Sequence, residues 1–212
     1  MPKLKKPRVV EPIAPELTRP DWIVLGLALA GLAVAGYLTA LKLGGTQAFL
    51  CRDGSGCDLV QASRYSVLAG VPTAMWGAGI YLAIAVLAAM PRTPRRWQSA
   101  FMLASGAVAF SLYLTFISIF VIGATCPYCL ASGGIAVALL VVMVWRRPAA
   151  QGRQAAAYKP GTLAGLGITA GVFTVLVGAF IFAADFSVPA GYQVALARHL
   201  AKNQAIFYGA FW

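Results

Sequence analysis

Four cysteines in two closely spaced pairs are the residues of this chain best suited to chemistry. Cys126 and Cys129 form a C-x-x-C pair where an apolar helix is expected to begin, and Cys51 and Cys57 lie in an earlier loop. Thiols two residues apart close a disulfide readily, and free N–H groups at a helix start lower the pKa of a thiol. Two such pairs predict a relay by thiol–disulfide exchange, in which one pair meets a soluble partner and the other passes electrons to an acceptor in the bilayer.

The elements that position these cysteines are membrane helices. Hydrophobic residues make up 60% of the 212 residues and charged residues 11%, whereas a soluble domain carries about 25% charged residues. Five apolar segments are long enough to cross a hydrocarbon core of about 30 Å. They run approximately over residues 22–43, 72–90, 98–122, 126–145 and 162–184. We predict an all-α integral membrane protein: a four-helix bundle with the catalytic core, a fifth transmembrane helix, and a short amphipathic interfacial helix at 58–68 in the first exported loop.

The placement of lysine and arginine predicts the orientation of these helices. Twelve of the 17 basic residues lie on the same side of the membrane as the N-terminus: before the first span, between the second and third, and between the fourth and fifth. The N-terminus is therefore predicted to be cytoplasmic. Because these residues flank the spans and form no stripe, the net charge of +11 does not indicate nucleic-acid binding. All four cysteines then face the exported side, which would be the periplasmic side of a bacterial inner membrane, where disulfides persist.

The cysteines could also have a purely structural role, either as disulfide bridges or as small packing residues. Packing cysteines should also occur within spans or on the cytoplasmic side, and the expected topology places none there. C-x5-C and C-x2-C across a membrane boundary match no usual zinc spacing, so we predict no metal. The redox interpretation is therefore preferred.

A quinone dissolved in the bilayer, such as ubiquinone or menaquinone, is the simplest electron acceptor, because the sequence carries no nucleotide or haem motif. The spans also lack clear mid-membrane charges, which argues against a transporter. Small and hydroxyl-bearing residues near the cysteines are candidate quinone contacts, although close helix packing explains such residues equally well. These candidates are Ser111 and Thr115, which share a helix face with Ser118, and Gly133 and Gly134, one turn beyond Cys129.

The cysteine pattern and its neighbours resemble the vitamin K epoxide reductase family in its bacterial form. The resemblance covers about residues 20–147, and its motifs follow the expected order. They are Cys51-x5-Cys57, Ser63-Arg64-Tyr65, Gly70-Val71-Pro72 and Cys126-Pro127-Tyr128-Cys129.

The resemblance implies a role for each matching residue. Cys51 would exchange with the partner protein, Cys57 would pass electrons to Cys126, and Cys129 would react with the quinone. Ser63 would form a hydrogen bond near that centre, and Thr73 would take the place of a polar quinone contact. Mammalian relatives carry a tyrosine near the position of Gly133, so the implied activity is quinone reduction coupled to disulfide formation and not vitamin K epoxide reduction.

Bacterial members of this family often carry a fifth helix and a fused thioredoxin-like domain, so the implied partner is such a domain or a periplasmic dithiol protein. The chain ends at Trp212, just before the C-x-x-C of such a domain would come, and we expect the sequence to be incomplete there. The predicted organisation has five parts. They are a disordered basic cytoplasmic tail (1–20), the four-helix domain (21–147), a cytoplasmic linker (148–160), the fifth transmembrane helix (161–185), and an exported linker with the first strand of the missing domain (186–212).

Two rival functions remain open at this point. The disulfide-bond formation protein B family performs similar chemistry on a four-helix bundle, but the short x5 loop and the serine pattern favour the first family. A non-enzymatic membrane scaffold with structural disulfides is the second rival. Structural bridges should resist mild reductant, whereas relay bridges should be reduced and then reoxidised by quinone.

Overall fold

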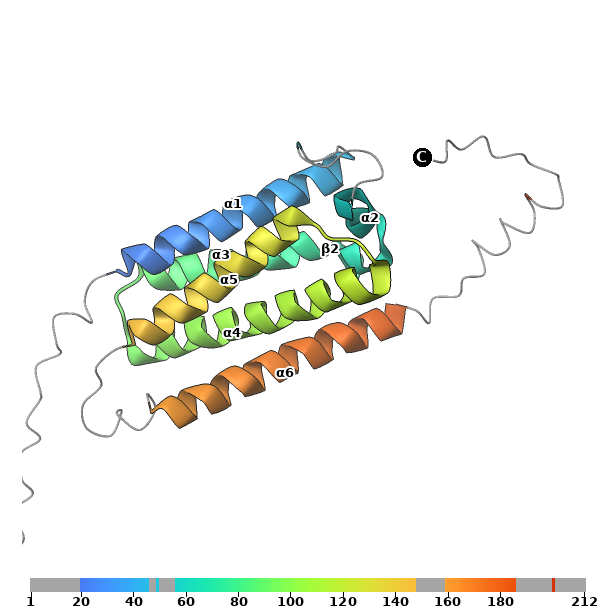
Figure 1. The fold of residues 1–212 in the computed structure, drawn as a ribbon. Helices are drawn as coiled ribbons and strands as arrows, with labels where there is room; N and C mark the ends of the chain where they lie inside the picture. Colours follow the sequence, from blue (N-terminus) through green and yellow to red (C-terminus); the bar gives the residue numbers. More distant parts are fainter. Residues whose placement is uncertain (1–19, 46–48, 50–55, 148–158, 186–199, 201–212) are drawn as a thin grey trace, which may run out of the picture.

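Helices make up most of the computed structural model, which describes residues 20–45, 49, 56–147, 159–185 and 200. The expectations for most of the basic tail, for most of the 148–160 linker, and for the exported linker and first strand after 185 lie outside these residues. The described elements follow one another along the chain as shown in Figure 1. They are α1 (Trp22–Gly44), α2 (Gly56–Ala62), the 3-10 turn η2 (Arg64–Ser66), β1 (Val67–Leu68), β2 (Val71–Pro72), α3 (Thr73–Ala89), α4 (Pro94–Phe116), the π-helical segment η3 (Ile117–Ile122), α5 (Pro127–Trp145) and α6 (Pro160–Asp185).

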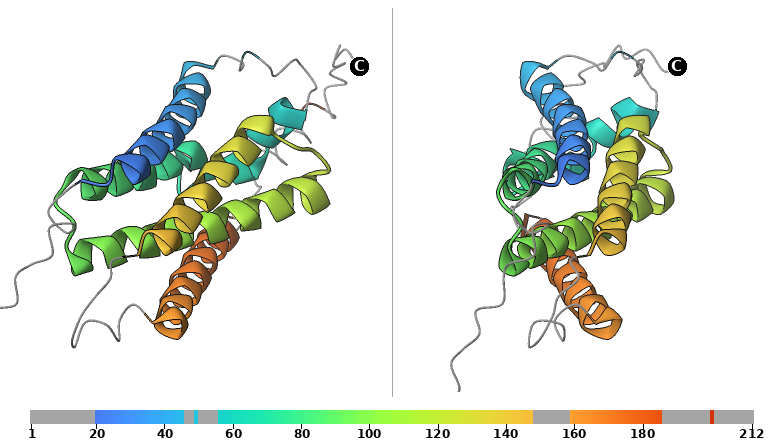
Figure 2. Two further views of the ribbon diagram at one scale, coloured as in Figure 1. Left: turned by 60° about the vertical axis from the view of Figure 1, so that its left-hand side comes forward. Right: turned by 90° about the vertical axis from the view of Figure 1, so that its left-hand side faces the viewer.

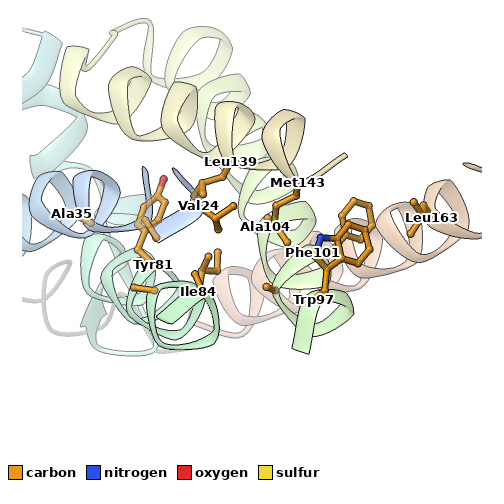
Figure 3. Packing of buried hydrophobic residues seen from close by; sticks show 14 residues of the cluster. Val24, Ala35, Tyr81, Ile84, Trp97, Phe101, Ala104, Leu139, Met143 and Leu163 are labelled. Atoms are coloured by element: carbon orange, nitrogen blue, oxygen red, sulfur yellow. The ribbon is translucent and has the colours of Figure 1, made fainter. Parts of the chain in front are cut away.

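Four of the helices form a bundle. α1 contacts α3 and α5, and α4 contacts the same two helices from the other side, while α6 packs along α4 (Figures 1 and 2). Apolar side chains from all four helices meet in the middle, where Ile84 and Leu139 are fully buried (Figure 3). This arrangement confirms the all-α expectation, and α6 is the additional fifth helix.

Four helices of the described chain are long and apolar enough to cross a membrane. They are Trp22–Gly44, Pro94–Ile122, Pro127–Trp145 and Pro160–Ala184. α3 is also apolar but has 17 residues, which gives it a length of about 25 Å, at the lower limit for a span. Pro72 precedes α3 and Pro91 follows its C-cap, and prolines at these places limit the helix. The chain is thus a multi-pass membrane protein.

Two expected helix boundaries differ from the structure. The third span begins at Pro94 instead of residue 98, because the Thr93 hydroxyl accepts a hydrogen bond from the Arg96 N–H and proline suits the first helical position. The interfacial helix predicted over 58–68 is shorter: α2 starts at Gly56 and stops at Ala62.

The second half of that predicted helix is instead the turn η2 followed by β1, the first strand of a small β-hairpin. β1 and β2 pair antiparallel, with Val67 opposite Pro72 and Leu68 opposite Val71. The two residues between them, Ala69 and Gly70, have positive φ angles of 54° and 76°, as a tight two-residue hairpin turn requires. The hairpin leads directly into α3 and covers the end of the bundle that also carries α2 (Figure 1).

The opposite end of the bundle is held by a buried carboxylate. Asp21, 6% exposed, forms ion pairs with Arg92 and with Arg146, the latter at 3.0 Å. Its carboxylate also caps α1 by accepting from the Val24 N–H, and its backbone N–H donates to the Ala88 carbonyl. One residue therefore joins the start of α1, the end of α3 and the end of α5.

Asp21→Ala should destabilise the fold. Removing the carboxylate leaves two guanidinium groups facing each other across a partly buried site, and we expect a loss of about 2 kcal/mol because Arg146 is half exposed and keeps some hydration. Thermal unfolding in detergent measures this loss, with Arg147→Ala as a control that removes a nearby exposed charge. An unchanged melting temperature for Asp21→Ala would contradict this role.

Candidate active site

Two cysteines that lie 69 residues apart in the sequence meet at the end of the bundle where α5 begins. Cys57 is the second residue of α2, and Cys126 is the N-cap of α5. Their sulfur atoms are 3.8 Å apart, and the residues are 2% and 1% exposed. Leu41, Val60 and Tyr128 pack around the pair. The sulfurs therefore lie in contact inside a small apolar cluster that excludes water.

The two sulfurs are in different oxidation states. Cys57 is disulfide-bonded, whereas Cys126 and Cys129 carry free thiols; Cys51 lies outside the described residues. Exchange requires a thiolate sulfur to approach a disulfide sulfur until a bond of about 2.05 Å forms. From 3.8 Å, this approach needs only a small movement of one side chain. The geometry is that of two pairs able to exchange a disulfide.

Gly56 sets how closely the two cysteine-bearing segments approach. A Cβ atom at Gly56 would lie 2.6 Å from the Thr125 carbonyl oxygen and 3.0 Å from the Thr125 nitrogen. Real Cβ atoms do not come this close to backbone, so only glycine allows the segment before Cys57 to touch the segment before Cys126. The sequence analysis did not single out Gly56, because a glycine after Gly54-Ser55 has the composition of an ordinary turn.

Hydrogen bonds at both sides fix the approach of these segments. The Lys42 ammonium group donates to the Gln61 carbonyl at 2.5 Å, which anchors the last turn of α2 to α1. The Ser118 hydroxyl donates to the Ala124 carbonyl at 2.5 Å, and the Ala124 N–H donates back to the Ser118 carbonyl. Gly123, with φ of 72°, makes the left-handed turn between η3 and this segment. The segments that carry Cys57 and Cys126 are thus both fixed by hydrogen bonds to neighbouring elements.

The start of α5 favours a thiolate at Cys126, which precedes the membrane-spanning residues. A hydrogen bond from the Cys129 thiol lowers the pKa of Cys126 from 9.0 to about 7, and it outweighs the opposing effect of burial. Hydrogen bonds from the Cys129 and Tyr128 backbone N–H groups act in the same direction, with the Cys129 nitrogen 3.3 Å from the Cys126 sulfur. Cys126 is therefore activated as a nucleophile near neutral pH.

The pH dependence of exchange should follow this lowered pKa. Above pH 7 Cys126 is mostly thiolate, and below it the thiolate fraction falls about tenfold per pH unit, so the rate at which Cys126 attacks the Cys57 disulfide should fall in the same way. The exchange rate is measured at a series of pH values by trapping free thiols at successive times. The pH at which the rate is half-maximal gives the midpoint. Cys129→Ala removes the main stabilising hydrogen bond and should raise the midpoint toward 9; an unmoved midpoint would contradict the assignment.

An apolar cavity of about 420 Å³ opens beside the two thiols. Cys126 and Cys129 line it together with residues from α1, α2, η2, the hairpin, α3, α4 and α6. Most lining side chains are aliphatic or aromatic, including Trp76, Ile80 and Phe110. Cys129 is an exposed residue, in contrast to the buried Cys126, and both line the cavity. Such a site suits a flat apolar ligand.

The structure brings some of the expected contacts to this cavity and not others. Thr73, Ser111 and Thr115 are among the lining residues. Gly133 is not: a Cβ there would lie 3.5 Å from the Ser111 Cβ, so this glycine serves the contact between α4 and α5. Gly134 and Ser63 are likewise absent from the lining, and the Ser63 hydroxyl donates to the Val60 carbonyl at 2.7 Å.

The fifth helix supplies one wall of the cavity, which the sequence analysis did not anticipate. Its lining residues are Phe173, Thr174, Val177, Gly178 and Ile181. Close packing holds α6 against α4, since a Cβ at Gly178 would meet the Phe110 ring at 2.6 Å and one at Gly106 would meet the Thr174 hydroxyl at 2.7 Å. Tyr65 of η2 also packs edge-on against Phe182. Within the described residues, no three metal-ligating side chains come together.

Comparison with known proteins agrees with the cysteine pattern. The thiol–disulfide oxidoreductase LTO1 of Arabidopsis thaliana is 26% identical over 205 residues, which cover 83% of this chain and 52% of the relative. The chain thus spans about half the length of that curated relative. A model of the vitamin K epoxide reductase family matches residues 22–144, which include Cys51, Cys57, Cys126 and Cys129. Since this match covers more than half of the sequence, the chain belongs to the vitamin K epoxide reductase family.

Proposed function

We propose that this protein is a membrane thiol–disulfide oxidoreductase that passes electrons from an exported dithiol protein, or a thioredoxin-like domain, to a quinone. The observation that carries the proposal is the 3.8 Å contact between the disulfide-bonded Cys57 and the free thiol of Cys126. Family membership and the printed name of the Arabidopsis relative support the same class of chemistry.

The relay begins with the pair Cys51 and Cys57. A dithiol partner reduces their disulfide by exchange and is itself oxidised. The Cys57 thiolate then attacks Cys126 in the Cys126–Cys129 disulfide, forming a Cys57–Cys126 bond and releasing Cys129 as a thiolate. Attack of Cys51 on Cys57 releases Cys126, so two electrons have moved inward. Disulfide-bonded Cys57 beside two free thiols is the arrangement expected at the end of this step.

The inner dithiol must then be reoxidised. In the proposed reaction Cys126 and Cys129 give two electrons and two protons to a quinone, which leaves as the quinol, and their disulfide re-forms. Cys129 is the candidate for contact with the quinone, because it is exposed and lines the apolar cavity. Cys126 is buried against Cys57 and is placed for the transfer between the pairs. The net result is the oxidation of exported thiols to disulfides.

The charges of the described residues support the proposed orientation. Arg92 lies between α3 and α4, Arg95 and Arg96 lie in the first turn of α4, and Arg146 and Arg147 follow α5. All are at the end of the bundle away from the cysteines (Figure 1). Only Lys42 and Arg64 lie at the cysteine end among the described residues. By the positive-inside rule, the cysteine end faces the exported side of the membrane. In a bacterium this places the site on the periplasmic face of the inner membrane.

Quinone reduction by the purified protein with a dithiol donor tests the proposal. Wild-type protein should convert ubiquinone or menaquinone to the quinol, Cys129→Ala should abolish turnover, and Cys51→Ala should mainly impair a protein donor. If the protein's disulfides are reduced and the quinone stays oxidised, the acceptor assignment is wrong. Disulfides that resist mild reductant would favour a structural role instead.

A further inference from the structure

One hydroxyl group in the cavity wall is both buried and without a hydrogen-bond partner among the described residues. The side-chain oxygen of Ser66 is buried and has no hydrogen-bond partner among the described residues, and Ser66 lines the cavity that contains Cys129. Buried hydroxyl groups are nearly always hydrogen-bonded in folded proteins, because leaving one unpaired is costly. An unpaired hydroxyl on a residue that lines an apolar cavity therefore points to a polar atom of a ligand.

Four other hydroxyl groups of this wall are already bonded to the protein. The Tyr81 hydroxyl donates to the Ser132 carbonyl at 2.6 Å, and the Ser118 hydroxyl donates to the Ala124 carbonyl. The Thr174 hydroxyl donates to the Ala170 carbonyl at 2.8 Å. Thr73, the residue expected to contact a quinone, donates to the Ser66 carbonyl at 3.2 Å. These side chains stabilise the wall, and Ser66 differs from them.

The backbone around Ser66 is fixed from both sides. Its N–H donates to the Ser63 carbonyl at 3.0 Å, and its carbonyl accepts from Thr73 at the start of α3. Ser66 ends the turn η2 and is followed at once by the paired strand β1. The position of its Cα is thus set by contacts that do not use the side chain, and rotation about the Cα–Cβ bond can turn the hydroxyl toward a molecule in the cavity.

We propose that the Ser66 hydroxyl donates a hydrogen bond to a carbonyl oxygen of the quinone and so helps to hold the ring beside Cys129. This inference rests on the proposed function and adds a recognition residue to it. A quinone carbonyl accepts hydrogen bonds and donates none, which matches a serine hydroxyl as donor. Family resemblance had suggested Ser63 for a hydrogen bond near this centre, but the Ser63 hydroxyl is bonded to Val60 and does not line the cavity.

Binding of two matched probes tests this role. Menadione carries two ring carbonyls, and methylnaphthalene has the same ring system without them. Calorimetry with fully oxidised protein, which holds no electrons to pass to the probe, measures both affinities without turnover. Ser66→Ala should weaken menadione binding about five- to tenfold and leave methylnaphthalene binding unchanged. Ser66→Thr, which keeps the hydroxyl, should retain menadione affinity.

Ser105→Ala is the matched control, because Ser105 is a buried serine outside the cavity whose hydroxyl donates to the Phe101 carbonyl. It should leave both affinities unchanged. Equal menadione binding by wild type and Ser66→Ala, or an equal loss for both probes, would overturn the assignment of Ser66. Absence of menadione binding to the wild type would instead overturn the proposed quinone site, and this inference with it.

Discussion

Cys126→Ser protein is expected to fold normally and to lose quinone reduction by about three orders of magnitude or more. Cys126 is the sulfur that touches Cys57, and it shares the start of α5 with Cys129. It therefore connects the inner pair to the outer pair. Serine cannot form a disulfide, and transfer between the pairs then has no route. Dithiol-driven quinone reduction measures the loss.

The fold of this variant should survive because serine replaces cysteine in its second role. The Cys126 sulfur accepts a hydrogen bond from the Cys129 N–H as the N-cap of α5, and serine is a preferred N-cap residue. Thermal unfolding should therefore match that of the wild type. Substantial quinone reduction by folded Cys126→Ser protein would show that electrons reach the acceptor without Cys126 and would contradict the relay.

Cys129→Ala offers a complementary readout on the same atoms. With Cys129 absent, Cys126 has no resolving partner in its own pair, and its 3.8 Å contact should favour a lasting disulfide with Cys57. Peptide mapping under non-reducing conditions identifies such a bond. Recovery of Cys126 only as a free thiol, under oxidising conditions, would argue against direct exchange between these two sulfurs.

Gly56→Ala is the second substitution for which we expect a large effect, although it changes no reactive group. The added methyl group would meet the Thr125 carbonyl at 2.6 Å, and backbone on both sides leaves no flexible side chain to move away. The segments that carry Cys57 and Cys126 must then separate. A displacement of about 1 Å between reacting atoms costs about a hundredfold in rate, so we expect a loss of that size in disulfide exchange.

The matched control for this change is Gly36→Ala in α1, where an added Cβ meets nothing within 4 Å. That variant should exchange and reduce quinone at the wild-type rate, and alanine in place of glycine should slightly favour its helix. Pre-reduced protein is mixed rapidly with quinone, and the free thiols are trapped at successive times. The rate at which each cysteine pair is oxidised measures exchange in both variants. Wild-type exchange in folded Gly56→Ala protein would show that the close backbone approach is not needed.

Residue types and their spacing were enough to identify the class of protein and the reactive cysteines. Long apolar segments must become helices in a bilayer, because each backbone N–H and carbonyl has to find its partner within the segment. Cysteine is chemically distinctive, so Cys126 and Cys129 could be identified from type and spacing alone. Both signals are local, which is why the helices and the C-x-x-C at the start of α5 agree with expectation.

Local patterns were less informative in the segment between the first and second spans. Residues 58–68 have a polarity that suits a helix. However, Ala69 and Gly70 adopt positive φ angles and form a hairpin turn, so the residues just before them pair as a strand and cannot be helical. Gly133 and Ser63 fitted a ligand site by their type and position. In the structure Gly133 lies at the contact between α4 and α5, and the Ser63 hydroxyl bonds to the Val60 carbonyl. A glycine suits a helix contact as well as a ligand site, and a serine hydroxyl can bond to the backbone as well as to a ligand, so residue type alone does not separate these roles.

The residues that complete the site could be identified only from the packing of the helices. Gly56 acts through Thr125, Ser66 is distinguished by a missing partner, and α6 provides a cavity wall through its packing on α4. Each of these depends on a distance between segments that are far apart in the chain. A sequence records residue types and spacings but no such distance, and contact between distant segments is set by how all the helices pack together.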